Sequence, residues 1–361
     1  MDEPTKTKET LARYKDLIDT DIAEHSQTLT ERWEKEFSLE TVAILDSYLA
    51  ILSRGGKRLR GALSIWAYEL AGGTDENLAV TLARHIEMIH TYLLVVDDVA
   101  DLAKVRRGGP SAHEIIKNYH IDQKWFGDPE HFGFVQAINA SLALQHLVMQ
   151  EISELATVDS IKLEALQQLN SVLFTTVIGQ ISDLNHQAMP GVTEHEVTRM
   201  MRQKTAYYSF VSPLQLGVIV AGKDWSEYLW LEKWALDVGL SFQITDDILG
   251  MFGDEKLTGK SNLDDLREGK MTLLIVRALE RANEQDKTAL LKALGNSAIG
   301  QPELEAVQAI VENSGALAYS QGLAKQYGAS ASAQLIEVPQ RFVTATTFLA
   351  ELSDYVLRRE K

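Results

Sequence analysis

The stretch His90–Pro110, HTYLLVVDDVADLAKVRRGGP, limits the possible folds most, because it places three aspartates directly after an apolar run. In an α-helix, His90, Leu94, Asp97 and Asp101 step by four, three and four residues and therefore form one stripe. Carboxylates this close repel one another, so a positive group must lie between them. A divalent cation bound through oxygen ligands is the simplest such group.

A second acidic cluster has the same design. An apolar run leads to Gln243 and then to the adjacent Asp246 and Asp247. If the two clusters face each other across a cavity, they can hold several divalent ions and, through them, a diphosphate. Mg²⁺ fits this role, since it is commonly bound by one or two carboxylates together with substrate phosphates. The adjacent Arg106 and Arg107 also indicate a phosphate-bearing ligand.

The rest of the chain shows helical periodicity, for example at Val42, Leu45 and Leu49. Thr193 followed by Glu196 predicts a helix start with a capping box. No window shows the alternation of a strand, and 7 prolines and 23 glycines among 361 residues are few for an all-β protein. The sequence therefore predicts helices throughout, after a flexible tail over residues 1–9.

Composition narrows the possible partners. The formal net charge of -16 argues against nucleic acid, whose phosphates require a basic surface. The absence of cysteine excludes disulfides and thiol chemistry. The N-terminus has no apolar core of a secretory signal, and no run of eighteen apolar residues predicts a membrane span. We therefore expect a cytoplasmic protein without a transmembrane segment.

Basic residues are placed to bind the phosphates that metal ions leave uncovered. The segment Ser53–Gly61 combines glycines with a basic run, and glycines let backbone N–H groups approach an anion. Below the aspartates, apolar helix faces would line a pocket for a hydrophobic tail. This layout fits ionisation of an allylic diphosphate in a pocket that excludes water. The basic candidates are Lys57, Arg60, Arg106, Arg107, Lys204 and Lys260.

From about Gly55 to Leu274, the sequence resembles the trans-isoprenyl diphosphate (polyprenyl) synthases. The family's motifs occur in the family's order: GGKRLR, IHTYLLVVDDVADLAKVRRG, GQISDL, KTAYYSF, FQITDDILGMFGDEKLTGK and DLREGKMTLL. The resemblance implies an all-α fold, a single isoprenoid-synthase-type helical bundle over residues 10–361 around a central cavity, usually homodimeric. It also implies a Mg²⁺-dependent head-to-tail condensation of isopentenyl diphosphate with an allylic diphosphate (dimethylallyl, geranyl or farnesyl). Three Mg²⁺ ions are implied, with Mn²⁺ as a possible substitute.

The resemblance also assigns roles to individual residues. The implied metal ligands are Asp97, Asp98, Asp101, Asp246 and Asp247. The implied binding residues are Arg106, Lys204 and Lys260 for the allylic diphosphate, Lys57, Arg60, His90 and Arg107 for isopentenyl diphosphate, and Lys270 for substrate. Oxygens at Lys204, Thr205 and Gln243 would stabilise the allylic cation, and these three complete the catalytic set with the five aspartates. The released diphosphate would take the proton.

Three departures from the family pattern stand out. Gly250 occupies the place of a third aspartate in the second cluster, and Gly61 replaces a usual proline. A Gly-Asp pair is missing near Ser141. The form D-D-x-x-G-x-F-G-D resembles a subgroup that makes short products.

Product length is predicted from the residues under the first cluster. Tyr92 lies five residues before Asp97, about 7 Å along a helix, and Leu93 follows it. In the family, a bulky aromatic residue there limits the product, which favours geranylgeranyl diphosphate and then farnesyl diphosphate. A plain core role for Tyr92 is an equal alternative.

Two other functions compete with the synthase. A class I terpene cyclase shares the first motif but needs no isopentenyl site, so GGKRLR and the second D-D pair argue against it. A non-catalytic or regulatory subunit of a heteromeric synthase is suggested by Gly250 and by the lost Gly-Asp pair. A helical scaffold with solvated acidic ends is the structural alternative.

Overall fold

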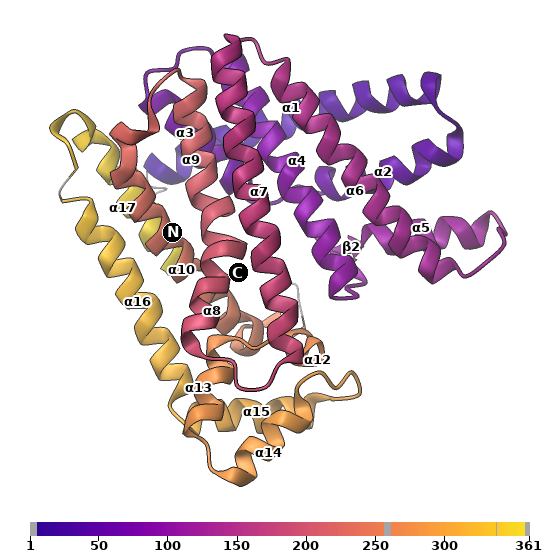
Figure 1. The fold of residues 1–361 in the computed structure, drawn as a ribbon, viewed down its shortest axis with the longest axis vertical. Coiled ribbons are helices and arrows are strands. Elements are labelled where there is room, and N and C mark those ends of the chain that lie inside the picture. The colour runs from indigo at the N-terminus through magenta and orange to yellow at the C-terminus, as the bar shows by residue number, and fades with distance from the viewer. Residues whose placement is uncertain (1–5, 256–260, 337, 358–361) are drawn as a thin grey trace. The chain divides into compact units, whose positions relative to one another are not determined.

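The computed structural model describes residues 6–255, 261–336 and 338–357, and helices dominate these ranges (Figure 1). The all-α prediction is confirmed. One small antiparallel pair interrupts the helices of the described chain, where β1 (Val105–Arg106) pairs with β2 (Gly109–Pro110). Contacts divide the chain into two compact units, and each is described by itself. The first comprises Met1–Gln168 with Pro213–Asp224, and the second comprises Leu169–Ser212 with Trp225–Lys361.

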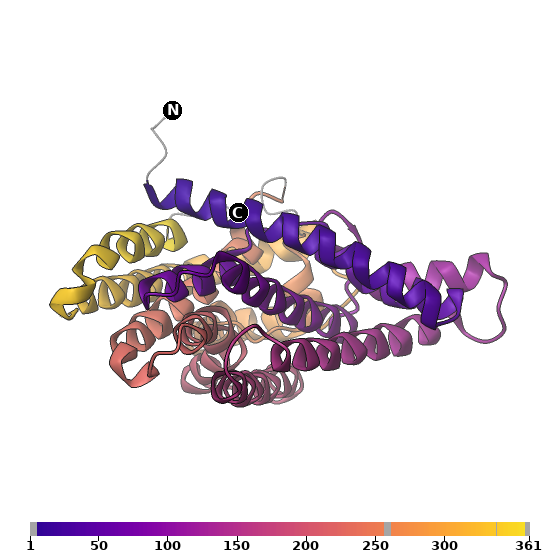
Figure 2. The same cartoon turned by 90° about the horizontal axis from the view of Figure 1, so that it is seen from above.

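The first unit is built around α4 (Glu76–Ala100), which packs against α3 and α6. The N-terminal helix α1 lies across α2, α3 and α4 (Figure 2). It begins at Lys6, within the range predicted as a flexible tail. The other elements are α1 (Lys6–Glu36), α2 (Leu39–Ser53), α3 (Leu59–Leu70), α5 (Ala112–Asp122), α6 (Pro129–Ser153), the start of α7 (Asp159–Ala188) and α9 (Ser212–Val220) after its first residue.

Local sequence explains where α4 begins and ends. The Asp75 carboxylate accepts a hydrogen bond from the Leu78 N–H at 3.1 Å, which satisfies one of the open donors of the first turn. Asp101 is the C-cap, and its N–H donates to the Asp97 carbonyl. One helix therefore carries His90, Leu94 and Asp97 of the predicted stripe, and Asp101, its fourth member, is the C-cap of that helix.

The second unit is organised by α10 (Leu229–Phe252), which packs against α16 and η1. Its other elements are the end of α7, α8 (Glu194–Met201), η1 (Arg202–Val211), η2 (Trp225–Tyr228), α12 (Asp264–Glu268), α13 (Leu273–Arg281), α14 (Glu284–Ala293), α15 (Gln301–Asn313), α16 (Ala316–Gln334), η3 (Gln340–Ala345) and α17 (Thr346–Leu357). The predicted capping box is present at the start of α8, where Thr193 and Glu196 bond to each other's backbone N–H groups.

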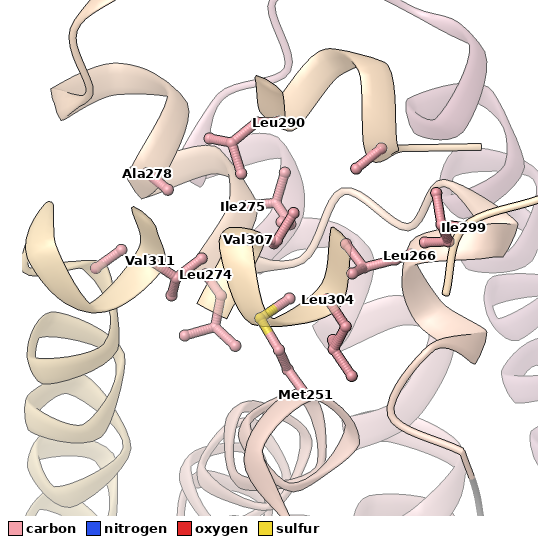
Figure 3. Packing of buried hydrophobic residues seen from close by; sticks show 12 residues of the cluster. Met251, Leu266, Leu274, Ile275, Ala278, Leu290, Ile299, Leu304, Val307 and Val311 are labelled. Atoms are coloured by element: carbon pink, nitrogen blue, oxygen red, sulfur yellow. The ribbon is translucent and has the colours of Figure 1, made fainter. Parts of the chain in front are cut away.

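A buried apolar cluster fixes the end of α10 against the short helices that follow it (Figure 3). Met251 of α10 contributes to this cluster together with Leu266 of α12 and Leu274 of α13. Leu304 and Val307 of α15 complete its centre. Burial of these side chains positions the segment that follows the second acidic cluster.

The segment η1 is a π-helix of ten residues that carries Lys204 and Thr205. π-Helical segments are rare in proteins, and those that occur are often found at functional sites. The backbone of η1 lies very close to α7. A Cβ added at Gly179 of α7 would lie 2.5 Å from the backbone nitrogen of Lys204. Only glycine fits this close contact.

Helix α6 qualifies the expectation that no segment spans a membrane. By length and composition alone it is long and apolar enough to cross one. A core helix of a soluble protein passes the same test, so this finding is weak evidence for a membrane span.

Val135, Ile138 and Leu142 of α6 are exposed. They are spaced at i, i+3 and i+7 and so form an apolar stripe without a partner in the described chain.

Candidate active site

In the first unit, Arg106 is the positive group beside the first acidic cluster. Its Nε donates to Asp98 Oδ1 at 2.7 Å, and its Nη2 lies 4.0 Å from Asp97 Oδ2. Asp98 is fully buried, and its Oδ2 has no hydrogen-bond partner among the described residues. Burial raises the pKa of Asp98 to about 6, although Arg106 opposes this shift. The structure thus brings together Asp97, Asp98 and Arg106.

The β1–β2 turn directs its two arginines to different partners. Arg107 has a left-handed backbone with φ 52°, and its side chain has another partner than that of Arg106. Its Nη1 donates to the Ile51 carbonyl at 3.1 Å, near the end of α2. Arg54 holds the turn itself, because its Nη1 donates to the carbonyls of Arg106 at 3.1 Å and Pro110 at 2.6 Å.

A basic cluster lies beside His90 in the same unit. Arg60 Nη1 is 3.3 Å from His90 Nε2, and a Cβ added at Gly56 would be 3.3 Å from Arg107 Nη2. Lys57 is exposed on the same loop. Burial lowers the pKa of His90 well below its usual value, and the neighbouring arginines lower it further, so the imidazole is neutral at pH 7.

The second unit contains a polar chain that runs from η1 to α10. Thr205 Oγ1 donates to Gln243 Oε1 at 2.7 Å, and Gln243 Nε2 donates to Asp247 Oδ1 at 2.8 Å. Burial raises the pKa of Asp247 well above its usual value, and Asp265 is the strongest nearby charge that adds to this shift. The structure therefore joins three of the predicted catalytic residues.

Lys204 has a partner that the sequence did not predict. Its Nζ donates to Asp183 Oδ2 at 2.6 Å, and Asp183 belongs to the GQISDL motif of α7. Lys270 is bound to carboxylates too, with its Nζ 2.5 Å from Glu268 and 3.5 Å from Asp265. Lys260 lies outside the described residues.

Asp265 is the site residue that sequence reasoning missed. A Cβ added at Gly250 would lie 2.6 Å from Asp265 Oδ2, so this carboxylate occupies the space beside the glycine that replaces the third aspartate. The signal was available in the motif DLREGK, which Asp265 opens. Helical spacing does not place Asp265 beside Gly250, because the two residues lie on different helices, α12 and α10.

The residues predicted to limit chain length lie on α4. Tyr92 is buried and Leu93 is half-buried. Burial raises the pKa of Tyr92, so its hydroxyl is neutral at pH 7. Their effect on product length stays a prediction.

The described side chains do not form a ready-made cation cage. Within residues 6–255, 261–336 and 338–357, no three histidine or acidic side chains are placed to hold one metal ion. The donor chemistry nevertheless fits a divalent cation, because carboxylate oxygens gather at the end of α4 and the Asp98 Oδ2 atom is buried without a partner. Asp246 and Asp247 supply the same donor type in the second unit.

Comparison with known proteins agrees with the motifs. Residues 42–312 match the family model described as polyprenyl synthetase. A geranylgeranyl diphosphate synthase of Saccharolobus solfataricus is 32% identical over 315 residues, which cover 86% of this chain and 89% of the relative. A short chain isoprenyl diphosphate synthase of Methanothermobacter thermautotrophicus is also 32% identical, with 97% of this chain and 98% of the relative covered.

The fold has a close counterpart among solved structures. A geranylgeranyl pyrophosphate synthase from Corynebacterium glutamicum, crystallised with isoprenyl diphosphate and magnesium, superposes with a TM-score of 0.89. The match covers 97% of this chain and 99% of that one. At 23% identity it supports the fold alone.

Proposed function

Since the chain belongs to the polyprenyl synthetase family and is a prenyltransferase of that family, we propose that it condenses isopentenyl diphosphate with allylic diphosphates to geranylgeranyl diphosphate. Farnesyl diphosphate is the second candidate product. The buried aromatic residue Tyr92 under the first acidic cluster supports a short product. The relative of Saccharolobus solfataricus is named a geranylgeranyl diphosphate synthase and that of Methanothermobacter thermautotrophicus a short chain isoprenyl diphosphate synthase, which supports a short product.

The single observation that carries the proposal is the pairing of two chemistries on α4. Asp97 and Asp98 stand at the end of this helix with Arg106 beside them, and His90 stands two turns earlier with Arg60 beside it. One unit thus offers a carboxylate cluster for a metal-bound diphosphate and a basic cluster for a second diphosphate. A terpene cyclase has one diphosphate substrate and needs no second cluster.

The metal would be held by the five motif aspartates. These are Asp97, Asp98, Asp101, Asp246 and Asp247. Bound Mg²⁺, with Mn²⁺ as a substitute, would neutralise the allylic diphosphate and so make it a better leaving group. Three ions are proposed.

The chain's own cations would bind what the metal leaves uncovered. Arg106, Lys204 and Lys260 would hold the allylic diphosphate, and Lys270 would support it. A guanidinium has five N–H donors, more than the Arg106 side chain gives to Asp98, so Arg106 can bind a carboxylate and a phosphate together. Lys57, Arg60, His90 and Arg107 would hold isopentenyl diphosphate.

Thr205 and Gln243 would act on the carbon skeleton. Their mutual hydrogen bond fixes both side-chain oxygens, so these dipoles need no reorganisation when the allylic cation forms. The isopentenyl double bond attacks that cation, a new carbon–carbon bond forms, and the released diphosphate takes the proton lost from the isopentenyl unit. Apolar surroundings would exclude the water that competes with this attack.

A non-catalytic subunit is the second candidate function, because Gly250 removes one expected carboxylate. Asp265 weakens the case for this alternative, since its carboxylate stands in the space next to Gly250. Asp265 would therefore keep the negative charge of the second cluster.

We expect a cytoplasmic homodimer. On α6 the exposed stripe of Val135, Ile138 and Leu142 would be covered by a second copy. On the part of α7 in the second unit, Phe174 is 70% exposed, and Ile181 is also exposed. Apolar stripes of this kind mark interaction surfaces.

One assay tests the proposal. The purified chain is incubated with Mg²⁺, isopentenyl diphosphate and each allylic starter, and the products are dephosphorylated and identified by chromatography. Geranylgeraniol from the chain alone is the expected result. Cyclic hydrocarbon would support a cyclase, and turnover that requires another protein would support the subunit.

A further inference from the structure

Glu87 is a buried carboxylate of α4 to which the proposed mechanism assigns no role. Its exposed fraction is 1%, and it lies three residues before His90. Its Oε1 accepts a hydrogen bond from the Gly61 N–H at 3.0 Å, and its Oε2 accepts one from Arg58 Nη1 at 3.4 Å. A buried charge is tolerated where a partner charge and hydrogen bonds compensate it, and Glu87 has both.

Arg58 connects Glu87 to two other helices. This arginine is 2% exposed. Its Nε donates to Asp19 Oδ1 of α1 at 2.8 Å, and its Nη2 donates to the Leu52 carbonyl at the end of α2 at 2.7 Å. The last carbonyls of a helix lack intrahelical partners, so Arg58 also caps α2. The pair therefore links α4 with α1 and α2. Lys15 of α1 forms an ion pair with the same Asp19.

The backbone at Arg58 requires this support. Its φ of 50° and ψ of 30° are left-handed, a conformation that costs a non-glycine residue energy. Such residues persist where the surroundings determine their conformation. Here the surroundings are the acceptors on Glu87, Asp19 and Leu52.

The loop and the first turn of α3 that are held in this way carry the basic cluster. Lys57 directly precedes Arg58, and Arg60 directly precedes Gly61. The two residues bonded to Glu87 therefore stand next to two residues proposed to bind isopentenyl diphosphate. The usual proline at position 61 has no N–H, so the bond from Gly61 is a feature of this chain.

Glu87 also balances charge inside the cluster. Burial, together with Arg58 and Arg60, lowers the pKa of Arg107 to about 10, and Glu87 opposes this shift. Without this carboxylate, the arginines would repel one another in a partly buried space.

We infer that Glu87 is a positioning residue, which holds the loop 55–58 and the first turn of α3 through Arg58 and the Gly61 N–H so that Lys57 and Arg60 can bind isopentenyl diphosphate. The inference rests on the proposed function. It predicts that Glu87 controls the use of isopentenyl diphosphate and not that of the allylic substrate.

The test compares Glu87→Gln with wild type, using the full-length enzyme and measuring KM for each substrate separately. Gln keeps an acceptor for the Gly61 N–H but loses the charge that pairs with Arg58. We expect KM for isopentenyl diphosphate to rise about tenfold, with KM for the allylic diphosphate and kcat within about twofold of wild type. The matched control is Glu151→Gln, which removes a partly buried carboxylate bonded to His85 of α4 and should leave the ratio of the two KM values unchanged.

Two further variants keep the test decisive if Glu87→Gln does not fold. Arg58→Lys keeps the charge but loses the three-way contact, and it should raise the same KM. Gly61→Pro removes the N–H donor while Gly61→Ala keeps it, so proline should raise KM for isopentenyl diphosphate more than alanine does.

An unchanged KM for isopentenyl diphosphate in the folded variants would overturn the inference. An equal rise in both KM values would overturn it as well, since a general loosening of the fold would act on both substrates. Inactive wild-type enzyme would instead refute the proposed function, before any variant is compared.

Discussion

The Oδ2 atom of Asp265 lies 2.6 Å from the point where the Cβ of any side chain at position 250 would stand. A side chain at position 250 and the Asp265 carboxylate would therefore need the same space, and in this structure the carboxylate of α12 occupies it. The same carboxylate is the strongest nearby charge that raises the pKa of Asp247.

This competition gives the first prediction, for Gly250→Ala. The new methyl group would displace the Asp265 side chain, which can rotate away, so the loss of stability should be small, about 1 kcal/mol. The concentration of Mg²⁺ needed for half-maximal rate should rise several-fold, because the second cluster loses a carboxylate. Asp265→Asn should produce the same rise, and the double variant should add little to it. Additive effects would show that the two residues act separately.

The second prediction concerns product length. Tyr92→Ala should shift the product to longer chains, because the side chain proposed to close the pocket is removed. The cavity should also cost about 3 kcal/mol of stability, measured by urea unfolding. Tyr48→Ala is the matched control, since Tyr48 of α2 is also buried and donates to the Met88 carbonyl. It should lower stability and leave the product unchanged. If the Tyr92→Ala variant made the wild-type product, as the Tyr48→Ala variant should, Tyr92 would be a core residue without a role in product length.

The third prediction is a loss of stability in acid that depends on Glu151. His85 Nε2 lies 2.8 Å and His25 Nε2 lies 3.1 Å from the Glu151 carboxylate, and Arg84 pairs with Asp21 beside them. Burial opposes ionisation of Glu151, but the two histidines outweigh it and hold its pKa well below the usual value. Burial also lowers the pKa of His85.

Both shifts act in the same direction. For each group, the unfolded chain takes up a proton at a higher pH than the folded chain does, so stability falls as pH falls. The loss should begin below the ordinary histidine pKa near 6.5 and continue below the ordinary glutamate pKa near 4.5. Urea unfolding at pH 7, 5 and 4 should show it, and Glu151→Gln should reduce the slope between pH 5 and pH 4, where the glutamate of the unfolded chain takes up its proton. An identical slope in the variant would exclude this cluster as the cause.

The fourth prediction concerns assembly. Leu142→Lys places a charge in the exposed stripe of α6 and should convert a dimer into a monomer, as measured by light scattering after gel filtration. Leu291→Lys on α14 is the control, because Leu291 is also exposed but belongs to no such stripe. If the wild type were a monomer, or if both variants were dimers, the prediction that α6 forms the dimer interface would be wrong.

The sequence predicts best what depends on neighbours along the chain. The capping box of Thr193 and Glu196 and the stripe on α4 follow from local spacing, and both are present. The contacts of Asp265 with Gly250 and of Glu87 with Gly61 join distant segments, and no periodicity reveals them. The different partners of the adjacent Arg106 and Arg107 are likewise set by tertiary contacts.

The π-helical form of η1 has a consequence for how this enzyme can change. Successive residues of an α-helix differ by about 100° around the axis, and a π-turn contains an additional residue. Deleting one residue between 202 and 211 would therefore do more than shorten the segment. It would restore ordinary helical winding and rotate Lys204 or Thr205 away from Asp183 or Gln243. Positions of this stretch other than 204 and 205 should therefore tolerate substitution far better than the stretch tolerates a change of length.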